Sequence, residues 1–192
     1  MARPREFEET LALDRAMHLF WQRGFDGTSM EDLVQATGVH RGSIYSTFGD
    51  KQALFLKALD HYLNLEQSQL ALALQNADSK LGVVRSILGG IAVDSTRPNG
   101  HGCFMVNSVI ERSARDAKTR KRANDCFLRL TRLFETALTQ ARQTGELRKD
   151  ADVGALALFL VNTIQGMRVL GKAGMTRVAL QANVEIAMRA LI

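Results

Sequence analysis

The chain has 192 residues, enough for one large domain or for two smaller domains that share a core. It is 46% hydrophobic and has only two prolines, which suits a mostly helical protein. Its two cysteines are too few for a disulfide framework, so we expect a reducing, cytoplasmic setting. The first nine residues lack the apolar core of a signal peptide, and no apolar run approaches the roughly 20 residues that span a bilayer. We expect the longest run, 155–161, to be a buried helix face.

The net charge of +5 favours polyanionic partners, but the charges are distributed unevenly. Residues 1–60 carry seven Lys/Arg against nine Asp/Glu, whereas residues 80–150 carry fourteen against seven. Charge alone therefore gives no support for nucleic-acid binding by the N-terminal part. Such binding requires that its cations gather on one face while the acids lie elsewhere. The cations concerned are Arg3, Arg5, Arg41 and Lys51.

The chain begins with a short basic arm and a helix. Residues 1–5 are either a disordered start or an arm that lies along DNA, with Arg3 and Arg5 near phosphates or in a minor groove. Residues 6–23 have apolar side chains at helical spacing and acidic side chains in the first turn, and Gly24 ends the helix. We expect Trp21 in the core and Phe25 packed under the next helix.

Residues 28–51 predict two short helices around a tight turn, followed by the start of a third helix. Thr28 or Ser29 caps the first helix, because a hydroxyl there accepts from a free N–H of the first turn. Gly38 ends it, because glycine adopts the left-handed conformation without steric cost. We expect Val39 to fill the corner between the two helices.

The second of these helices runs from about residue 41 to residue 48. Ile44 and Phe48 are four residues apart and share the side that faces the core. The positions between them are small or polar, which is the surface expected of a DNA-reading helix. Gly49 stops this helix, and Asp50 caps the long helix that begins at Lys51.

At these residues the chain resembles the TetR/AcrR family of bacterial transcriptional regulators. The similarity is close over about residues 10–55, and the remainder agrees in length and helical layout. One departure is His40, where the family usually carries Ser or Thr as a better helix cap. The matching residues are Gly24-Phe25, Thr28-Ser29, Ala36-Thr37-Gly38-Val39, Ile44-Tyr45, Phe48, Asp50-Lys51 and Leu54-Phe55.

Long helices follow. Residues 51–77 form one helix without Gly or Pro, about 40 Å long at 1.5 Å per residue, and this helix links the DNA reader to the rest of the chain. A helix over 81–95 contains Gly82, Gly89 and Gly90, which suggest close packing or a bend. A loop over 96–102 precedes helices over 103–112 and 115–143.

The last two helices, 151–170 and 175–191, are expected to form a dimer interface. The first is apolar on nearly every side, so most of its surface must be covered. Its small residues, Gly154, Ala155, Ala157 and Gly166, allow another helix to approach. Two such helices from each of two subunits make a four-helix interface, and the family resemblance implies the same twofold homodimer. The alternative is that the pair is simply the core of a monomer.

The resemblance implies that the second helix of the motif enters a major groove of double-stranded DNA. Arg41 would reach a guanine edge or a phosphate, Tyr45 would donate to a phosphate, and Lys51 would bind phosphate at a helix start. The alternative for Tyr45 and Thr28 is packing and capping alone. The predicted DNA-binding residues are Thr28, Ser29, His40, Arg41, Gly42, Ser43, Tyr45, Ser46, Thr47 and Lys51.

A basic run at residues 112–122, RSARDAKTRKR, holds six cations and one acid. Such clusters often bind nucleic acid. This one is far in sequence from the helix-turn-helix, so we favour a solvated helix start.

The resemblance also implies a ligand cavity in the C-terminal part. Cys103 follows a glycine at a helix start, where N–H groups stabilise a thiolate, and it resembles a subgroup whose members sense electrophiles or oxidants. A plain buried cysteine is the alternative, and a metal site of His101, Cys103 and Cys126 lacks paired spacing. The candidate pocket residues are Cys103, Phe104, Met105, Phe127, Phe134, Phe159 and Met167.

The sequence thus predicts an all-α fold of about nine helices: a helix-turn-helix DNA-binding domain over 1–50, with the motif at about 29–48, and a regulatory and dimerisation domain over 51–192. The function it favours is a DNA-binding repressor that a small-molecule or thiol-reactive inducer releases from a palindromic operator. We expect no cofactor, metal or membrane partner. The alternatives are an architectural DNA-binding dimer without ligand, and an enzyme, which the four scattered histidines and the lack of a phosphate loop disfavour.

Overall fold

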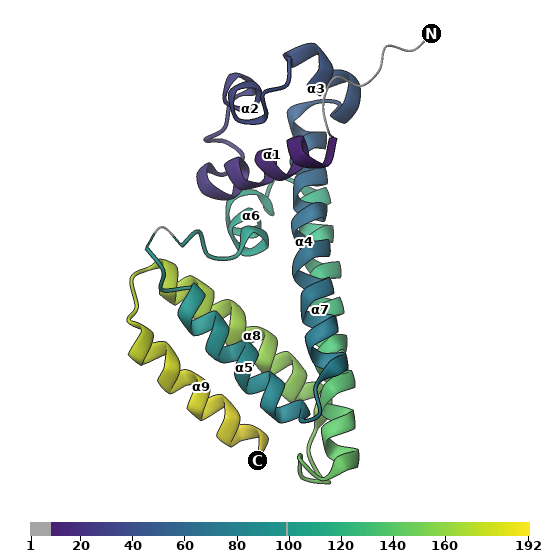
Figure 1. Ribbon diagram of the computed structural model, residues 1–192, viewed down its shortest axis with the longest axis vertical. Coiled ribbons are helices and arrows are strands. Elements are labelled where there is room, and N and C mark those ends of the chain that lie inside the picture. The colour runs from purple at the N-terminus through teal and green to yellow at the C-terminus, as the bar shows by residue number, and fades with distance from the viewer. Residues whose placement is uncertain (1–8, 99) are drawn as a thin grey trace. The chain divides into compact units, whose positions relative to one another are not determined.

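The computed structural model describes residues 9–98 and 100–192 (Figure 1), and the regular structure in that part is entirely helical. The prediction of an all-α fold of about nine helices is confirmed. The described helices are α1 (Glu9–Arg23), α2 (Met30–Thr37), α3 (Arg41–Phe48), α4 (Lys51–Asn76), α5 (Lys80–Asp94), α6 (Phe104–Arg112), α7 (Ala117–Thr144), α8 (Val153–Lys172) and α9 (Arg177–Leu191).

The chain forms two compact units that do not follow its order in sequence. The first unit holds residues 1–65 and 107–122, and the second holds residues 66–106 and 123–192. Helices α4, α6 and α7 each contribute residues to both units. The basic run at 112–122 therefore belongs to the unit that holds the helix-turn-helix, although the sequence suggested the regulatory part. The domain boundary after residue 50 stays a prediction.

The ends of the first helices follow from a few side chains. Ser29 caps α2 in a reciprocal capping box with Asp32, and Gly38 ends α2 at a φ of 71°. The Asp50 carboxylate accepts from the Ala53 N–H at 2.7 Å and so caps α4. Val39 is buried between α2 and α3, as expected. These local predictions are confirmed.

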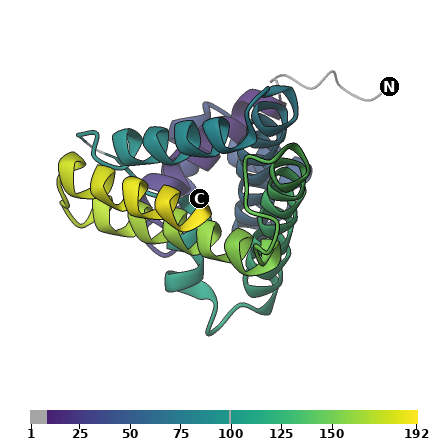
Figure 2. The ribbon, with the colours of Figure 1, turned by 90° about the horizontal axis from the view of Figure 1, so that it is seen from below.

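The core of the second unit lies among α5, α8 and α9, which pack side by side in both views (Figures 1 and 2). Leu88, Leu160 and Val184 are fully enclosed there, one from each helix. The close approach occurs at Gly171, where an added Cβ would lie 2.5 Å from Cβ of Ser95. The close packing considered for Gly89 and Gly90 is absent, since no atom lies within 4 Å of a Cβ built at either residue.

Helix α8 is amphipathic in the folded chain. By length and composition it could cross a membrane, contrary to the sequence expectation, but a core helix of a water-soluble protein passes the same test. One face, with Ala157, Leu160 and Ile164, is buried. The opposite face is exposed, so the expectation that 155–161 is a buried face holds only for part of that run. Its exposed large side chains are Leu158, Phe159, Val169 and Leu170.

Candidate nucleic-acid interface

The start of α2 is fixed by a small polar cluster. The Asp32 N–H donates to Ser29 Oγ at 3.0 Å, and the Ser29 N–H donates to Asp32 Oδ2 at 2.8 Å. Arg23 adds an ion pair to Asp32 at 2.9 Å. The Ser29 bonds first, and then Arg23, lower the pKa of Asp32, so this carboxyl stays ionised. Ser29 itself is exposed at the helix start, where backbone N–H groups favour an anion.

Thr28 does not fit the predicted DNA contact. Its side chain is only 1% exposed, and its hydroxyl donates to Gly24 O at 2.7 Å. The side chain therefore stabilises the turn before α2 and cannot reach a phosphate. The sequence did not indicate which of the two neighbouring hydroxyl residues is buried and which caps α2. The structure shows that Thr28 is buried and that Ser29 is the cap.

Helix α3 has one buried side and one open side. Ile44 and Phe48 are buried, as their spacing predicted. The first N-terminal turn lacks a side-chain cap, because His40 occupies the cap position without a capping hydrogen bond. A Cβ added at Gly42 would meet no atom within 4 Å, so a second molecule could approach the backbone there.

The open side of α3 carries the predicted DNA-binding side chains. His40, Arg41, Gly42, Tyr45 and Ser46 are exposed, whereas Ser43 and Thr47 are half-buried. Tyr45 is 42% exposed, a high value for an aromatic side chain that could otherwise pack. The structure thus brings these residues onto one helix.

Arg41 is held across this surface by weak interactions. It pairs with Glu31 of α2 at 2.6 Å, but both side chains are more than half exposed. Its guanidinium also lies 5.7 Å from the centre of the Tyr45 ring. An exposed ion pair of this kind is weak because water screens it, so a DNA phosphate or base could replace Glu31 as the partner of Arg41.

Lys51 lies at the start of α4 and points to an aromatic ring. Its ammonium is 4.2 Å from the centre of the Phe25 ring. Phe25 stacks on Phe20 of α1 and meets the edge of Phe55 of α4. Its packing under the next helix, α2, stays a prediction. The cation–π contact positions Lys51 without neutralising its charge. The predicted arm residues Arg3 and Arg5 lie outside the described residues.

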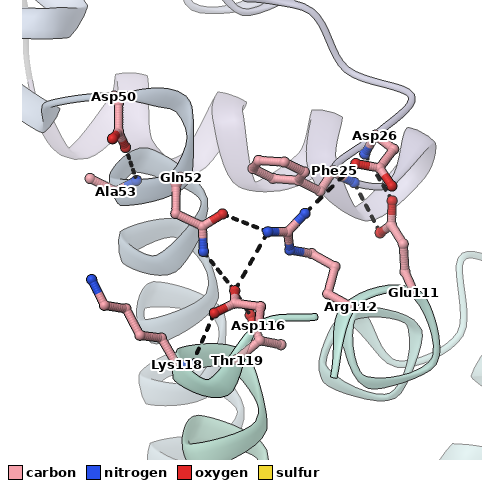
Figure 3. A network of polar contacts seen from close by, with 10 residues as sticks. All are labelled: Phe25, Asp26, Asp50, Gln52, Ala53, Glu111, Arg112, Asp116, Lys118 and Thr119. Carbon is pink, nitrogen blue, oxygen red and sulfur yellow. Dashed lines mark hydrogen bonds and ion pairs between the residues drawn. The ribbon is translucent and has the colours of Figure 1, made fainter. Parts of the chain in front are cut away.

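Helix α6 binds the turn that follows α1 through hydrogen bonds (Figure 3). Glu111 accepts hydrogen bonds from the backbone N–H of Phe25 at 3.0 Å and of Asp26 at 2.8 Å. Glycine is favoured at position 24 because its φ is 76°, and an added Cβ would lie 2.9 Å from a Glu111 oxygen, so Glu111 would have to shift. The α1–α2 turn is thereby fixed from outside its own sequence.

Arg112, the next residue of α6, extends this network of contacts to α4 and to the start of α7. Its guanidinium lies 3.6 Å from the Phe25 ring centre and donates to Gln52 Oε1 at 2.6 Å. The Gln52 amide donates in turn to Asp116 at 2.6 Å. Burial alone would raise the pKa of Asp116, but hydrogen bonds from Thr119, Gln52 and the start of α7 outweigh it and lower this pKa to about 2. We call Glu111, Arg112, Gln52 and Asp116 the α6 clamp.

No sequence signal marked the α6 clamp. Glu111 and Arg112 lie 85 or more positions from the turn that they hold, and they fit no motif. Arg112 belonged to the basic run, which was interpreted as solvated; this interpretation is wrong for Arg112, which is 14% exposed. The glycine followed by an aromatic residue at Gly24-Phe25 could have suggested that another segment packs closely there. It could not have indicated that this segment is α6.

The predicted pocket residues are mostly enclosed in the chain. Cys103, Phe104, Met105, Phe134 and Met167 are at most 4% exposed, and Phe127 is half-buried. Phe159 departs from the prediction, because it is 37% exposed on the open face of α8. Burial, and then the nearby Cys103, raise the pKa of Cys126 to about 11, so its thiol stays protonated at neutral pH. Within 9–98 and 100–192, no three His, Cys, Asp or Glu side chains could share a metal ion.

Comparison with known proteins places this geometry in a family. Residues 12–58 match the family model "Bacterial regulatory proteins, tetR family", and residues 84–186 match "Tetracyclin repressor-like, C-terminal domain". The HTH-type transcriptional repressor ComR of Escherichia coli is 32% identical over 176 residues, covering 90% of this chain and 83% of ComR. The HTH-type transcriptional regulator YezE of Bacillus subtilis is 30% identical, and the match covers all of both chains.

A solved structure agrees over the whole chain. A cysteine mutant of the TetR family transcriptional regulator CifR, complexed with 26 bp double-strand operator DNA, is 31% identical with a TM-score of 0.88 and full coverage of both chains. The two family matches together span most of the sequence, and they include the helix-turn-helix with its open α3. The chain therefore belongs to the TetR family and is a DNA-binding transcriptional regulator.

Proposed function

We propose that this protein is a homodimeric repressor that binds a palindromic operator through α3 and leaves it when an inducer binds. The observation that carries the proposal is the open, polar side of α3, held by a buried Ile44 and Phe48 in a chain related to repressors. CifR is a relative seen with operator DNA. Because operator DNA lies in the bacterial cytoplasm, we place the protein there.

Each predicted contact has a chemical role. Arg41 exchanges Glu31 for a guanine edge or a phosphate, and the Tyr45 hydroxyl donates to a phosphate. Ser29 presents the N–H groups of α2, and Lys51 presents its ammonium at the start of α4. Small residues between them let the helix approach the base edges. The residues of this proposed interface are Ser29, His40, Arg41, Gly42, Ser43, Tyr45, Ser46, Thr47 and Lys51.

The apolar faces of α8 and α9 support a twofold dimer through 151–170 and 175–191. On α9, Val178 is 82% exposed and Ile186 is 60% exposed, eight positions apart and so on one side of the helix. A Cβ at Gly166 of α8 would meet no atom, which leaves room for a partner helix. Such faces cost free energy in water unless they are covered, and a second copy covers both at once.

The inducer is a small molecule that enters the second unit, or an electrophile that reacts with Cys103. The raised pKa of Cys126 leaves Cys103, at the start of α6, as the candidate nucleophile. The Cys103 thiol would lose its proton to solvent, the thiolate would add to the C=C bond of the electrophile to form a thioether, and solvent would return a proton to the adjacent carbon. An electrophile such as N-ethylmaleimide should then release DNA from the wild type and not from Cys103→Ser. Equal release from both would remove Cys103 as the sensor.

The test of the main proposal is selection from random duplexes by the purified protein. We expect a palindromic site with half-sites one helical turn apart, about 34–36 Å, or a multiple of that. Sedimentation should give two chains per duplex. Selection without any palindromic site at low salt would overturn the proposal. Ligand-dependent shifts of the melting temperature would separate it from an architectural dimer that has no ligand.

A further inference from the structure

The basic run at residues 112–122 is packed beside the DNA reader. Asp116, which precedes α7, accepts from Gln52 on the first turn of α4 at 2.6 Å. Two turns later, Arg122 pairs with Asp60 of α4 through two bonds of 2.8 and 3.1 Å. The first turns of α7 therefore lie along α4 from residue 52 to residue 60. Gln52 is the immediate neighbour of Lys51, a predicted phosphate contact.

The run divides into cations that face α4 and cations that are exposed. Arg112 and Arg122 face α4 and have carboxylate or amide partners there. Arg120 is exposed, and its guanidinium donates to the backbone carbonyl of Ser113 at 3.1 Å. Among the described residues, the exposed side chains of Arg115 and Lys118 have no ion-pair partner. We call the exposed set the α7 basic surface: Arg115, Lys118, Arg120 and Lys121.

The place of these cations, at the start of α7, is unfavourable for the helix macrodipole. The first turn of α7 contains no acidic residue, and cations at a helix N-terminus oppose the macrodipole. Lys118 and Lys121 are three positions apart on one side of the helix, so their like charges lie near each other. A cluster of cations at the start of a helix is typical of a functional surface that binds an anionic partner.

The surface also changes the charge of the DNA-binding unit. Residues 1–65 carry seven Lys/Arg against nine Asp/Glu, and residues 107–122 add six against two. The unit as folded thus has thirteen cations against eleven acids. In Figure 3, Lys118 extends from α7 along α4 toward the turn capped by Asp50. The polyanion that this position fits is duplex DNA that continues past the bases read by α3.

We propose that the α7 basic surface binds backbone phosphates of the operator duplex outside the base pairs that α3 reads. The proposal rests on the proposed function, because α3 must first dock in a groove. The contacts add affinity without sequence information, since phosphates are the same in every sequence. They also steepen the salt dependence, because each neutralised phosphate releases counterions.

The test compares two duplexes with one selected operator, one trimmed to the operator and one with about 15 flanking base pairs on each side. The variant Lys118→Gln/Lys121→Gln removes two charges of the surface. The matched control, Arg132→Gln/Lys149→Gln, removes two exposed charges of the second unit. Affinities are measured by fluorescence anisotropy between 50 and 200 mM salt, and folding is checked by thermal melting.

We expect the surface variant to bind the flanked duplex about tenfold more weakly than wild type and the trimmed duplex unchanged. The slope of log K against log salt on the flanked duplex should fall by about 0.9 for each phosphate that the variant no longer neutralises. The control should match wild type on both duplexes. Identical affinity and slope for variant and wild type, or equal weakening on both duplexes, would overturn the proposal. Absence of specific binding by the wild type would instead overturn the proposed function.

Discussion

Two sides of the first unit differ in how firmly their side chains are held. On the open side of α3, Arg41 has an exposed ion pair, and the Tyr45 hydroxyl accepts a long, exposed hydrogen bond of 3.5 Å from Arg41. Away from that side, Glu111 and Arg112 of the α6 clamp bind the α1–α2 turn and α4 by short, partly buried hydrogen bonds. The side chains on the open side of α3 can therefore exchange their present partners for DNA, whereas the α6 clamp keeps its partners and holds the helices in place. Catalytic and binding sites commonly depend on such division between contact and support.

The largest decrease in the free energy of unfolding is expected when Arg112, at the centre of the α6 clamp, is replaced. Arg112→Ala removes the cation over Phe25, the donor to Gln52 Oε1 and an ion-pair partner of Asp116. We expect a decrease of about 3 kcal/mol in the free energy of unfolding, measured by urea denaturation. The control Arg115→Ala, at an exposed position, should change it by less than about 0.5 kcal/mol. Equal effects would show that the clamp adds nothing to stability.

A second prediction concerns the turn that the clamp holds. Gly24→Ala imposes a positive φ on alanine and places a Cβ against Glu111, so we expect the free energy of unfolding to fall by about 2 kcal/mol. In a Glu111→Ala background the clash is absent, and the same substitution should cost about 1 kcal/mol less. The four proteins form a double-mutant cycle read by thermal or urea unfolding. Strict additivity of the two changes would show that Gly24 and Glu111 are not coupled.

A third prediction concerns how the contribution of the α6 clamp to the free energy of unfolding depends on pH. The pKa of Asp116 is lowered to about 2 from 3.8, so its carboxylate stabilises the folded state above pH 4 and this contribution disappears as the pH falls toward 2. The wild type should exceed Asp116→Asn in unfolding free energy by roughly 2 kcal/mol at pH 6, and the gap should close by about pH 2. A gap independent of pH would mean that the charge of Asp116 is not what the clamp uses.

The smallest effect on stability is expected for a substitution on the open side of α3. Tyr45→Phe removes one exposed hydroxyl, so the melting temperature should not change. Operator affinity should fall about tenfold if that hydroxyl donates to a phosphate, because a hydrogen bond to a charged group contributes about 1.5 kcal/mol or more. Anisotropy with the selected operator measures the change. Affinity equal to wild type would assign Tyr45 a packing role.

Local patterns in the sequence predicted the reading side well. The cap at Ser29, the turn at Gly38 and the buried pair Ile44 and Phe48 each depend on neighbours within a few residues. Helix bounds were also predicted closely, since Gly, Pro and capping residues act locally. The burial of Thr28 was not predicted, because two adjacent hydroxyl residues look alike until the turn is built.

Contacts between distant segments were beyond the sequence. Glu111 binds a turn 85 positions away, and nothing at either place indicates the other. The basic run was assigned to the regulatory part by its place in the chain, whereas packing against α4 places it in the first unit. The open faces of α8 and α9 emerge only after the core has taken the other sides of those helices.

The central claim is that the exposed side of α3 enters DNA. Ser46→Glu places a negative charge on that side without disturbing a buried group, because Ser46 is exposed and bonds only to the Ser43 carbonyl. The control Asn64→Glu adds the same charge at an exposed position of α4 in the same unit. We predict that Ser46→Glu lowers operator affinity at least 100-fold at an unchanged melting temperature, while the control binds like wild type. Operator binding by Ser46→Glu at wild-type affinity would contradict the claim.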